Sequence, residues 1–410
     1  MAPFQYKLLH QDKHTQARLG IIHTPHGDIH TPAFVPVGTQ ASVKSLTPEE
    51  ITSVGSEVFF VNTYHIYLRP GMDVINKFYG LHEFMNWHGP IMTDSGGFQV
   101  FSLARGKSYG DVDAAAAGSL VKITDDGVEF QSHWDGSKHM FTPEFSMNLQ
   151  WQLGSDIHIA FDDCPAYPAT HEVAQKSMEH THRWAKESLD AHKKISRSWS
   201  MVHSKSKTMN NEPFTMNNYQ ALYGSIQGST FEDLRKESAK FIAGLDFDGL
   251  AIGGVAVGES KKEMVHVLDW VTPILPPEKP RHLLGVGEID DIFALVARGM
   301  DTFDCVQPTR LARMGRLFIH SNIRENELDI TKAMFTEDTN PIEVGCTCYT
   351  CQHFSRAYIH HLFHVRELLA YRLATIHNIH FINRLTEDIR KAIAEDSFIE
   401  LSNKWLYNRI

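Results

Sequence analysis

Eight short apolar segments, each ending in a polar residue or a glycine, recur along the chain of 410 residues. They cover residues 31–38, 57–62, 90–94, 157–162, 221–227, 249–254, 282–287 and 302–307. Stretches with a helical pattern separate them. Apolar strands that alternate with helices are typical of a parallel sheet covered on both faces, and eight such units favour a closed barrel over an open sheet. We therefore expect an α/β fold, a (β/α)8 TIM barrel over residues 1–340.

The strand pattern stops at about residue 340, where a cysteine cluster and then helical sequence follow. We expect residues 341–410 to form a zinc-binding helical subdomain. Two stretches, 105–121 and 195–220, are polar or weakly periodic. We expect both to be long surface loops, the second of them partly disordered.

Three of the five cysteines, Cys346, Cys348 and Cys351, lie within six residues. This C-x-C-x2-C spacing is typical of zinc ligation in a reducing compartment, and a loop with three free thiols is the alternative. One imidazole would complete the set. The spacing alone leaves four candidates for it: His360, His361, His364 and His377. Four protein ligands leave no open coordination position, so we expect a structural zinc ion.

A second histidine group consists of His23, His26 and His30. Pro25 and Gly27 lie between these histidines and favour a turn between two short strands. A turn is therefore a better interpretation of this group than a metal site.

Acidic residues lie at or near the expected strand ends in three of the apolar segments: Asp94, the pair Asp162 and Asp163, and Asp304. A parallel barrel carries its working residues just after the strands, although a single acid there is more often a helix cap. Other segment ends supply a loop with an aromatic residue, a side-chain amide and a double glycine. These are Ser95, Gly96, Gly97 and Phe98, then Gln227, then Gly253 and Gly254. Together they suit a flat, purine-like ring, with two further carboxylates for glycosidic chemistry.

Several longer motifs resemble those of the bacterial-type tRNA-guanine transglycosylases (queuine tRNA-ribosyltransferases), along nearly the whole chain. They are TDSGGFQVFSL (93–103), FDDCPAYPAT (161–170), IQGSTFEDLR (226–235), GGVAVGE (253–259), FDCVQPTR (303–310), CTCYTC (346–351), SRAYIHHL (355–362) and TIHNI (375–379). The resemblance implies a barrel with a zinc subdomain that works as a homodimer. It also implies exchange of guanine at wobble position 34 of a tRNA with a GUN anticodon for a 7-deazaguanine, preQ1 or queuine, in queuosine biosynthesis.

The resemblance also assigns roles. Asp304 is the implied nucleophile, which forms a covalent intermediate with the ribose, and Asp94 is the implied general acid and base. The implied base-binding residues are Ser95, Gly96, Gly97, Phe98, Asp162, Gln227, Gly254 and Leu284. The implied RNA contacts are Arg310 and Arg313, with Arg316 nearby. The implied Zn²⁺ ligands are Cys346, Cys348, Cys351 and His377.

The formal net charge of −10 argues against a general nucleic-acid binder, so any RNA contact must rest on a local basic patch. The N-terminus carries no pattern of a secretory signal, and the apolar runs are too short to cross a bilayer. We expect a cytoplasmic enzyme without a membrane anchor. Two other functions are considered: a glycoside or nucleoside hydrolase with the same carboxylate pair, and a tRNA-binding subunit without activity. Retention of both Asp94 and Asp304 argues against the second.

Overall fold

The computed structural model describes residues 4–104, 121–132, 134–202, 219–321 and 326–406. Eight parallel strands form its central sheet, and each of them overlaps one of the eight predicted apolar segments. They are β4 (Ala33–Pro36), β5 (Phe59–Val61), β6 (Ile91–Thr93), β10 (Ile157–Ile159), β11 (Ala221–Ile226), β12 (Gly249–Ile252), β13 (Arg281–Leu283) and β14 (Thr302–Cys305).

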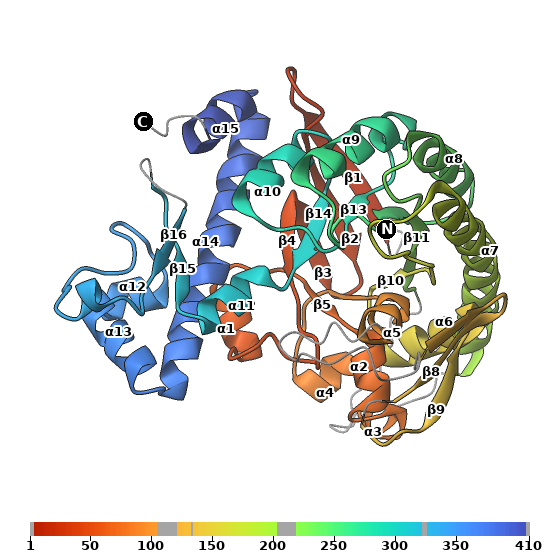
Figure 1. The fold of residues 1–410 in the computed structure, drawn as a ribbon, viewed down its shortest axis with the longest axis horizontal. Coiled ribbons are helices and arrows are strands. Elements are labelled where there is room, and N and C mark those ends of the chain that lie inside the picture. Colours follow the sequence, from red (N-terminus) through yellow and green to blue (C-terminus); the bar gives the residue numbers. More distant parts are fainter. Residues whose placement is uncertain (1–3, 105–120, 133, 203–218, 322–325, 407–410) are drawn as a thin grey trace.

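The central sheet closes into a barrel. Its hydrogen-bonded order is β4-β14-β13-β12-β11-β10-β6-β5, which leaves β4 and β5 at the two ends. A parallel bridge between Val37 and Phe60 joins these ends, and the amide of Gly38 donates to the carbonyl of Phe60 at 2.7 Å. The predicted (β/α)8 architecture is confirmed (Figure 1).

Helical segments follow every strand and form the outer layer, as right-handed crossovers between parallel strands require. The helices are α1 (Pro48–Ser53), α2 (Thr63–Leu68), α3 (Met72–Lys77), α4 (Leu81–Met85), α5 (Gly97–Ala104), α6 (Pro143–Leu153), α7 (His171–Val202), α8 (Glu232–Ala243), α9 (Lys261–Val271), α10 (Ile289–Val296) and α11 (Gln307–Arg313). A short 3-10 turn, η2 (Thr272–Ile274), follows α9. An antiparallel sheet of β7 (Val121–Thr124), β8 (Gly127–Gln131) and β9 (Lys138–Phe141) is inserted between α5 and α6.

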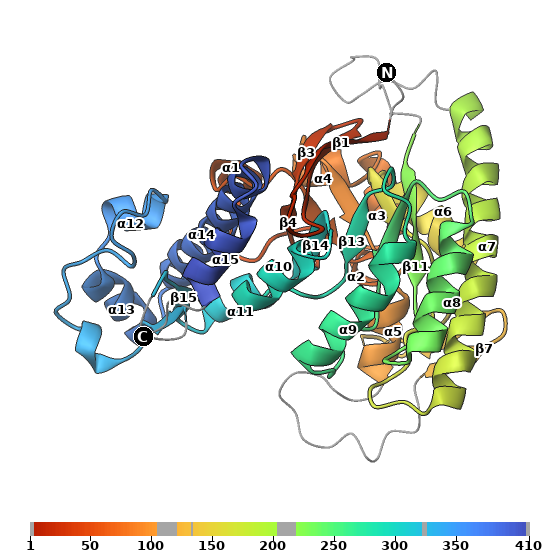
Figure 2. The ribbon, with the colours of Figure 1, turned by 90° about the horizontal axis from the view of Figure 1, so that it is seen from above.

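A second antiparallel sheet covers the amino ends of the barrel strands. It consists of β1 (Gln5–Gln11), β2 (Arg18–Thr24) and β3 (Gly27–Thr31). Ile22 and Ile29 of this sheet are fully buried and pack into the same apolar cluster as the side chains inside the barrel. Arg18 forms a buried ion pair with Asp301, the residue before β14. The sheet therefore closes this end of the barrel, as seen from above in Figure 2.

Helix α7 corrects one prediction. Residues 195–202 were expected in a surface loop, but they form the last turns of α7. The buried positions Leu189, His192 and Ile195 continue the helical spacing into this stretch. Extending an existing helix costs far less than starting one, so a serine-rich end is tolerated. Residues 203–218 and 105–120 lie outside the described residues, and Val121, the last residue of the other predicted loop, begins β7.

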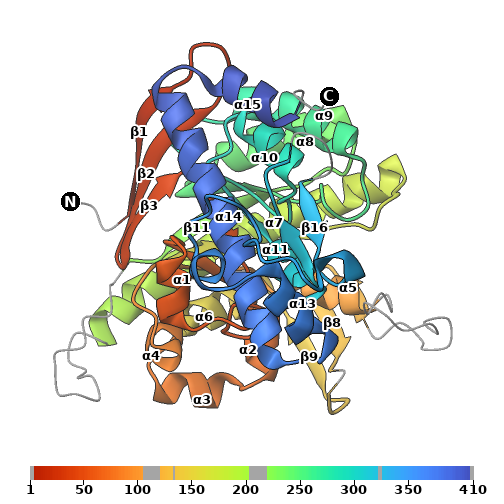
Figure 3. The ribbon, with the colours of Figure 1, turned by 90° about the vertical axis from the view of Figure 1, so that its left-hand side faces the viewer.

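The C-terminal part begins with a hairpin and continues mainly as helices. Its elements are β15 (Arg316–Phe318), β16 (Glu327–Asp329), η3 (Ala333–Phe335), α12 (Tyr349–His353), α13 (Arg356–His364), α14 (Leu368–Ala394) and α15 (Phe398–Leu406). The expected helices after residue 355 are thus confirmed. The long helix α14 packs against α12 and α13 and also against β4 and α11 of the barrel (Figures 1 and 3). The domain division at residue 340 stays a prediction.

Candidate active site and metal centre

Four polar side chains predicted from the sequence gather at the carboxyl ends of the barrel strands. Asp94 follows β6, Asp162 lies three residues after β10, Gln227 follows β11, and Asp304 lies in β14. All four are buried, Asp94 and Asp304 with 8% and 9% of their surface exposed. Parallel strands bring their carboxyl ends to one face of the barrel, which is why residues 210 positions apart (304 minus 94) meet.

Asp94 is held by three hydrogen bonds to its carboxylate. The donors are Nδ2 of Asn62 at 2.5 Å, the amide of Thr63 at 2.8 Å and the amide of Gly96 at 3.1 Å. Burial raises the pKa of Asp94 to about 6, although the three hydrogen bonds lower it, and the nearby charge of Asp304 raises it further. Near neutral pH this group can therefore both donate and accept a proton.

Asp304 is held through one of its two carboxylate oxygens. The amide of Gly285 donates to Oδ1 at 3.0 Å, and Nε2 of His282 lies 3.2 Å from the same atom. His282 belongs to β13, the strand next to β14, and its side chain is fully buried. Within the described residues the Asp304 carboxylate thus has two hydrogen-bond partners, and both contact the oxygen Oδ1.

A carboxylate, an amide and a glycine loop lie next to this acid pair. Nε2 of Gln227 donates to Oδ2 of Asp162 at 2.7 Å. Burial raises the pKa of Asp162 to about 6. Oε1 of Gln227 is buried and has no hydrogen-bond partner in the described part of the chain. A Cβ atom on Gly254 would lie 2.5 Å from that Oε1, and Gly254 has a φ of +62°, so the loop approaches the amide as only glycine allows.

The remaining predicted base-site residues surround this group. Ser95 is buried, and its Oγ accepts from the amide of Gly97 at 3.3 Å. Gly97 begins α5 and lies against the Asp162 carbonyl, because a Cβ there would come within 3.1 Å of that oxygen. Phe98 is 44% exposed, so its ring is available for stacking. Leu284 lies 3.5 Å from the position of a Gly253 Cβ.

The three clustered cysteines and His377 form a buried group whose ligand atoms all lie within 4.8 Å of one another. Nδ1 of His377 lies 3.8, 3.5 and 3.4 Å from the sulfurs of Cys346, Cys348 and Cys351. A tetrahedral zinc centre has a sulfur-to-nitrogen edge of about 3.6 Å, given Zn–S near 2.3 Å and Zn–N near 2.05 Å. Nε2 of His377 donates to the carbonyl of Phe318 at 2.7 Å, which leaves Nδ1 free to bind a metal. The residues therefore fit a metal ion.

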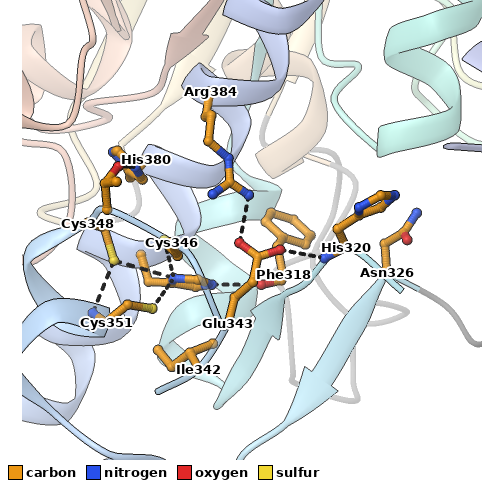
Figure 4. Close-up of polar contacts among 12 residues, drawn as sticks. Phe318, His320, Asn326, Ile342, Glu343, Cys346, Cys348, Cys351, His380 and Arg384 are labelled. Carbon is orange, nitrogen blue, oxygen red and sulfur yellow. Dashed lines mark hydrogen bonds and ion pairs between the residues drawn. The ribbon is translucent and has the colours of Figure 1, made fainter. Parts of the chain in front are cut away.

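The structure selects His377 among the four candidate histidines. Nδ1 of His360 instead contacts the carbonyl of Ile330 at 2.8 Å. Neither His361 nor His364 belongs to the metal-ligating group found in the described residues. Figure 4 shows the cysteines beside Glu343, whose carboxylate links Arg384 of α14 at 2.6 Å to the amide of His320 at 2.8 Å.

Comparison with known proteins decides the family. The family model described as Queuine tRNA-ribosyltransferase matches residues 12–409. The chain belongs to this family. It is 48% identical over 405 residues to the queuine tRNA-ribosyltransferase of Thermoanaerobacter pseudethanolicus, with 99% of this chain and 97% of the relative covered. The relative from Caldanaerobacter subterraneus is 47% identical over 406 residues (99% and 98% covered), and that from Staphylococcus aureus 45% over 405 residues (99% and 96% covered).

Membership in the queuine tRNA-ribosyltransferase family makes the chain a pentosyltransferase, as the sequence motifs indicated. The described residues contain no helix that combines the length and the apolar character needed to span a membrane. The roles of the individual site residues stay predictions.

Basic residues lie directly after β14, the strand that carries Asp304. Arg310 and Arg313 both belong to α11, and Arg313 donates to the carbonyl of Thr309 at 2.9 Å. Burial lowers the pKa of Arg313, and the like charge of Arg310 adds to this effect. Arg316 in β15 forms an ion pair with Glu327. The two arginines of α11 therefore form a local concentration of positive charge.

The histidine group near the N-terminus is a turn, as expected. Residues 25 and 26 connect β2 and β3. The three rings have separate carboxylate partners: His23 has Asp28, His26 has Asp156 and His30 has Glu57.

Sequence reasoning missed Asn62 and His282. Asn62 ends the apolar segment 57–62, so the rule that pointed to Asp94 applied to it equally. His282 begins the segment 282–287, where a polar residue inside an apolar run was the available signal.

Proposed function

We propose that this family member exchanges the guanine at wobble position 34 of tRNA with a GUN anticodon for a 7-deazaguanine, preQ1 or queuine, in queuosine biosynthesis. The observation that carries the proposal is the pair Asp94 and Asp304, two buried carboxylates close enough that the charge of Asp304 raises the pKa of Asp94, with the polar groups of Asp162 and Gln227 beside them. The family match supports guanine exchange in tRNA as the reaction.

The proposed chemistry is a double displacement. Oδ2 of Asp304 attacks C1′ of the ribose, and the electron pair of the broken C1′–N bond leaves with guanine, which takes a proton from Asp94. The incoming base then attacks C1′ and gives its proton to Asp94, while the pair of the C1′–Oδ2 bond returns to Asp304. One N-glycosidic bond replaces another, and a carboxylate fixed on the barrel stabilises the positive charge that develops on the sugar.

The base-binding roles rest on the unfilled hydrogen-bonding capacity of this site. The buried Oε1 of Gln227 requires a donor, which a ring or amino N–H of the base would supply. Asp162 accepts N–H groups, the Gly254 amide donates to a carbonyl, and Phe98 stacks on the ring. The backbone of Ser95, Gly96 and Gly97 and the side chain of Leu284 complete the pocket.

The RNA contacts are assigned to Arg310 and Arg313. Their two positive charges on α11 form a local basic site, although the net charge of the whole chain is −10. The wobble nucleotide must leave its stack to reach the buried acids, which costs least in a single-stranded loop.

A structural Zn²⁺ ion, held by Cys346, Cys348, Cys351 and His377, is proposed for the metal centre, because the sulfur and nitrogen positions match tetrahedral edges. A homodimer is supported by apolar side chains exposed in the C-terminal part. Val344 is 78% and Leu368 80% exposed, with Tyr349 and Tyr358 also accessible. The cytoplasmic location stays a prediction.

The exchange reaction is tested with tRNA that carries labelled guanine at position 34, incubated with and without added preQ1. Added base should drive release of label and appear in the tRNA. Asp304→Asn should bind tRNA but form no covalent adduct on a denaturing gel. Release of label at the same rate without any acceptor base would instead identify a hydrolase.

A further inference from the structure

Asp304 is the end of a buried chain of polar groups. Oγ1 of Thr302 lies 2.9 Å from Nδ1 of His282, and Nε2 of His282 lies 3.2 Å from Oδ1 of Asp304. Thr302 and Asp304 are both on β14 and point to the same side, because they are two residues apart in a strand. His282 reaches across from β13, which pairs with β14 in parallel register.

We infer that His282 is a positioning residue, which fixes Asp304 so that Oδ2 is the attacking oxygen while Oδ1 stays hydrogen-bonded throughout the reaction. The inference rests on the proposed role of Asp304 as nucleophile. An ionised carboxylate can only accept hydrogen bonds, so Nε2 of His282 carries the hydrogen and donates it. In the neutral ring Nδ1 is then an acceptor, and the hydroxyl of Thr302 donates to it. The hydrogen-bond chain therefore runs from Thr302 through His282 to Asp304.

The surroundings hold the imidazole in one orientation. The side chain of His282 is fully buried, and its ring stacks on that of Phe60 with centroids 5.9 Å apart and an interplanar angle of 14°. The amide of Gly285 adds a second donor to Oδ1 of Asp304 at 3.0 Å. Two donors on one oxygen define the plane of the carboxylate and leave the other oxygen to the ribose.

The two donors act in both halves of the exchange. When Oδ2 forms its bond to C1′, Oδ1 becomes the carbonyl oxygen of an ester and still accepts from His282 and Gly285. When the incoming base displaces Asp304, negative charge returns to the carboxylate, and the donors on Oδ1 stabilise it as a leaving group. Loss of the His282 donor should therefore slow both steps without weakening the hold on the RNA.

The decisive test compares His282→Phe with His282→Gln in single turnover. Phenylalanine keeps a ring against Phe60 but has no donor, whereas the Nε2 of glutamine can donate from nearly the same place. We expect His282→Phe to slow adduct formation and its discharge by added guanine by about 10- to 100-fold. Binding of tRNA should be unchanged, and His282→Gln should recover most of the rate. His158→Gln, which alters another fully buried histidine in contact with the rings of Trp151 and His192, is the matched control and should react at the wild-type rate.

Two outcomes would overturn the inference: a wild-type rate in His282→Phe, or a His282→Gln variant as slow as His282→Phe. If His282→Phe does not fold, Thr302→Val decides. Removal of its hydroxyl should slow the reaction severalfold, and a wild-type rate would count against the hydrogen-bond chain. The proposed function fails separately, if the wild-type enzyme forms no adduct or if Asp304→Asn still forms one.

Discussion

At the scale of single residues, burial of the carboxylates should make the stability of the fold depend on pH. Burial raises the pKa of Asp94 and of Asp162 to about 6. An acid with a raised pKa in the folded state gives full stability below its unfolded pKa, near 3.9, and loses it as the pH rises through the folded value. The folded enzyme should therefore be less stable at neutral pH than at pH 4 because of the two groups that are proposed to act in the exchange.

Asp94→Asn should separate activity from stability. The variant should lose exchange activity, because its amide cannot transfer the proton. Its gain in the free energy of unfolding over the wild type should be larger at pH 8 than at pH 4 by about 2 to 3 kcal/mol, because the pKa of Asp94 is about 6 in the folded protein and near 3.9 in the unfolded chain. Thermal unfolding of wild type and variant from pH 4 to 8 measures this gain. A difference in Tm that does not change with pH would contradict the raised pKa of Asp94.

Gly254→Ala should damage the base pocket specifically. Its Cβ would lie 2.5 Å from Oε1 of Gln227, so either the amide or the loop must move. We expect at least about a tenfold higher KM for the incoming base, since both groups are proposed to bind it. Gly154→Ala is the matched control, because Gly154 has a similar φ of +71° but no atom closer than 3.9 Å to the added Cβ. An equal effect of both substitutions would point to backbone strain alone.

At the scale of elements, the strands could be predicted and one helix end could not. Strands buried on both faces are apolar throughout, so all eight segments stood out from the sequence. The helical end at residues 195–202 did not stand out from the sequence, because the last turns of a helix that is already packed need few apolar residues of their own. The positions of His282 and Asn62 carried a sequence signal, but their contacts with Asp304 and Asp94 depend on which strand lies next to which, and spacing along the chain does not contain that pairing.

Helix α14 joins the two parts of the molecule through buried polar contacts. Nδ2 of Asn378 donates to the carbonyls of Pro308 and Arg316 at 3.1 and 3.0 Å, and its Oδ1 accepts from the amide of Phe318 at 3.0 Å. These contacts tie α14 to α11 and β15, the elements that follow β14.

Asn378→Leu should therefore lower the free energy of unfolding by about 2 to 4 kcal/mol, because three backbone groups would lose their partner in a buried place. Denaturant unfolding measures this change. Asn403→Leu, at an exposed position of α15, is the control and should have an effect below about 0.5 kcal/mol. Similar values for the two variants would refute the joining role of Asn378.

At the scale of the whole molecule, the proposed metal centre holds together segments of the C-terminal part that are far apart in the sequence: residues 346–351, α14 and, through His377, β15. His377 lies on α14 and binds the carbonyl of Phe318 in β15 while its Nδ1 faces the cysteine sulfurs. The cysteine spacing predicted this centre. The choice of histidine needed the family resemblance, because His377 lies 26 residues after Cys351 and only the packing of α14 places the two side chains together.

Cys348→Ser should reduce the zinc content of the purified protein and lower its Tm. Loss of one thiolate lowers the affinity of the site for zinc, and metal binding contributes directly to the folding of such sites. Elemental analysis and thermal unfolding measure the two effects together. Cys164→Ser, which changes a buried cysteine outside the metal group, should retain the full zinc content. Unchanged zinc in Cys348→Ser would argue against the proposed ligand set.

The sheet β1–β3 has a consequence for the kinetic order of the reaction. It seats Ile22 and Ile29 in the amino end of the barrel, so in the described structure that end is closed and the proposed base site lies at the opposite end, after the strands. Under the proposed function, guanine and its replacement must then use the same entrance, the one by which the tRNA reaches Asp304. The first base must depart before the second can arrive, and free guanine should compete with the incoming base. If the proposed exchange holds, the closed amino end of the barrel therefore favours a ping-pong order, in which the first product leaves before the second substrate binds.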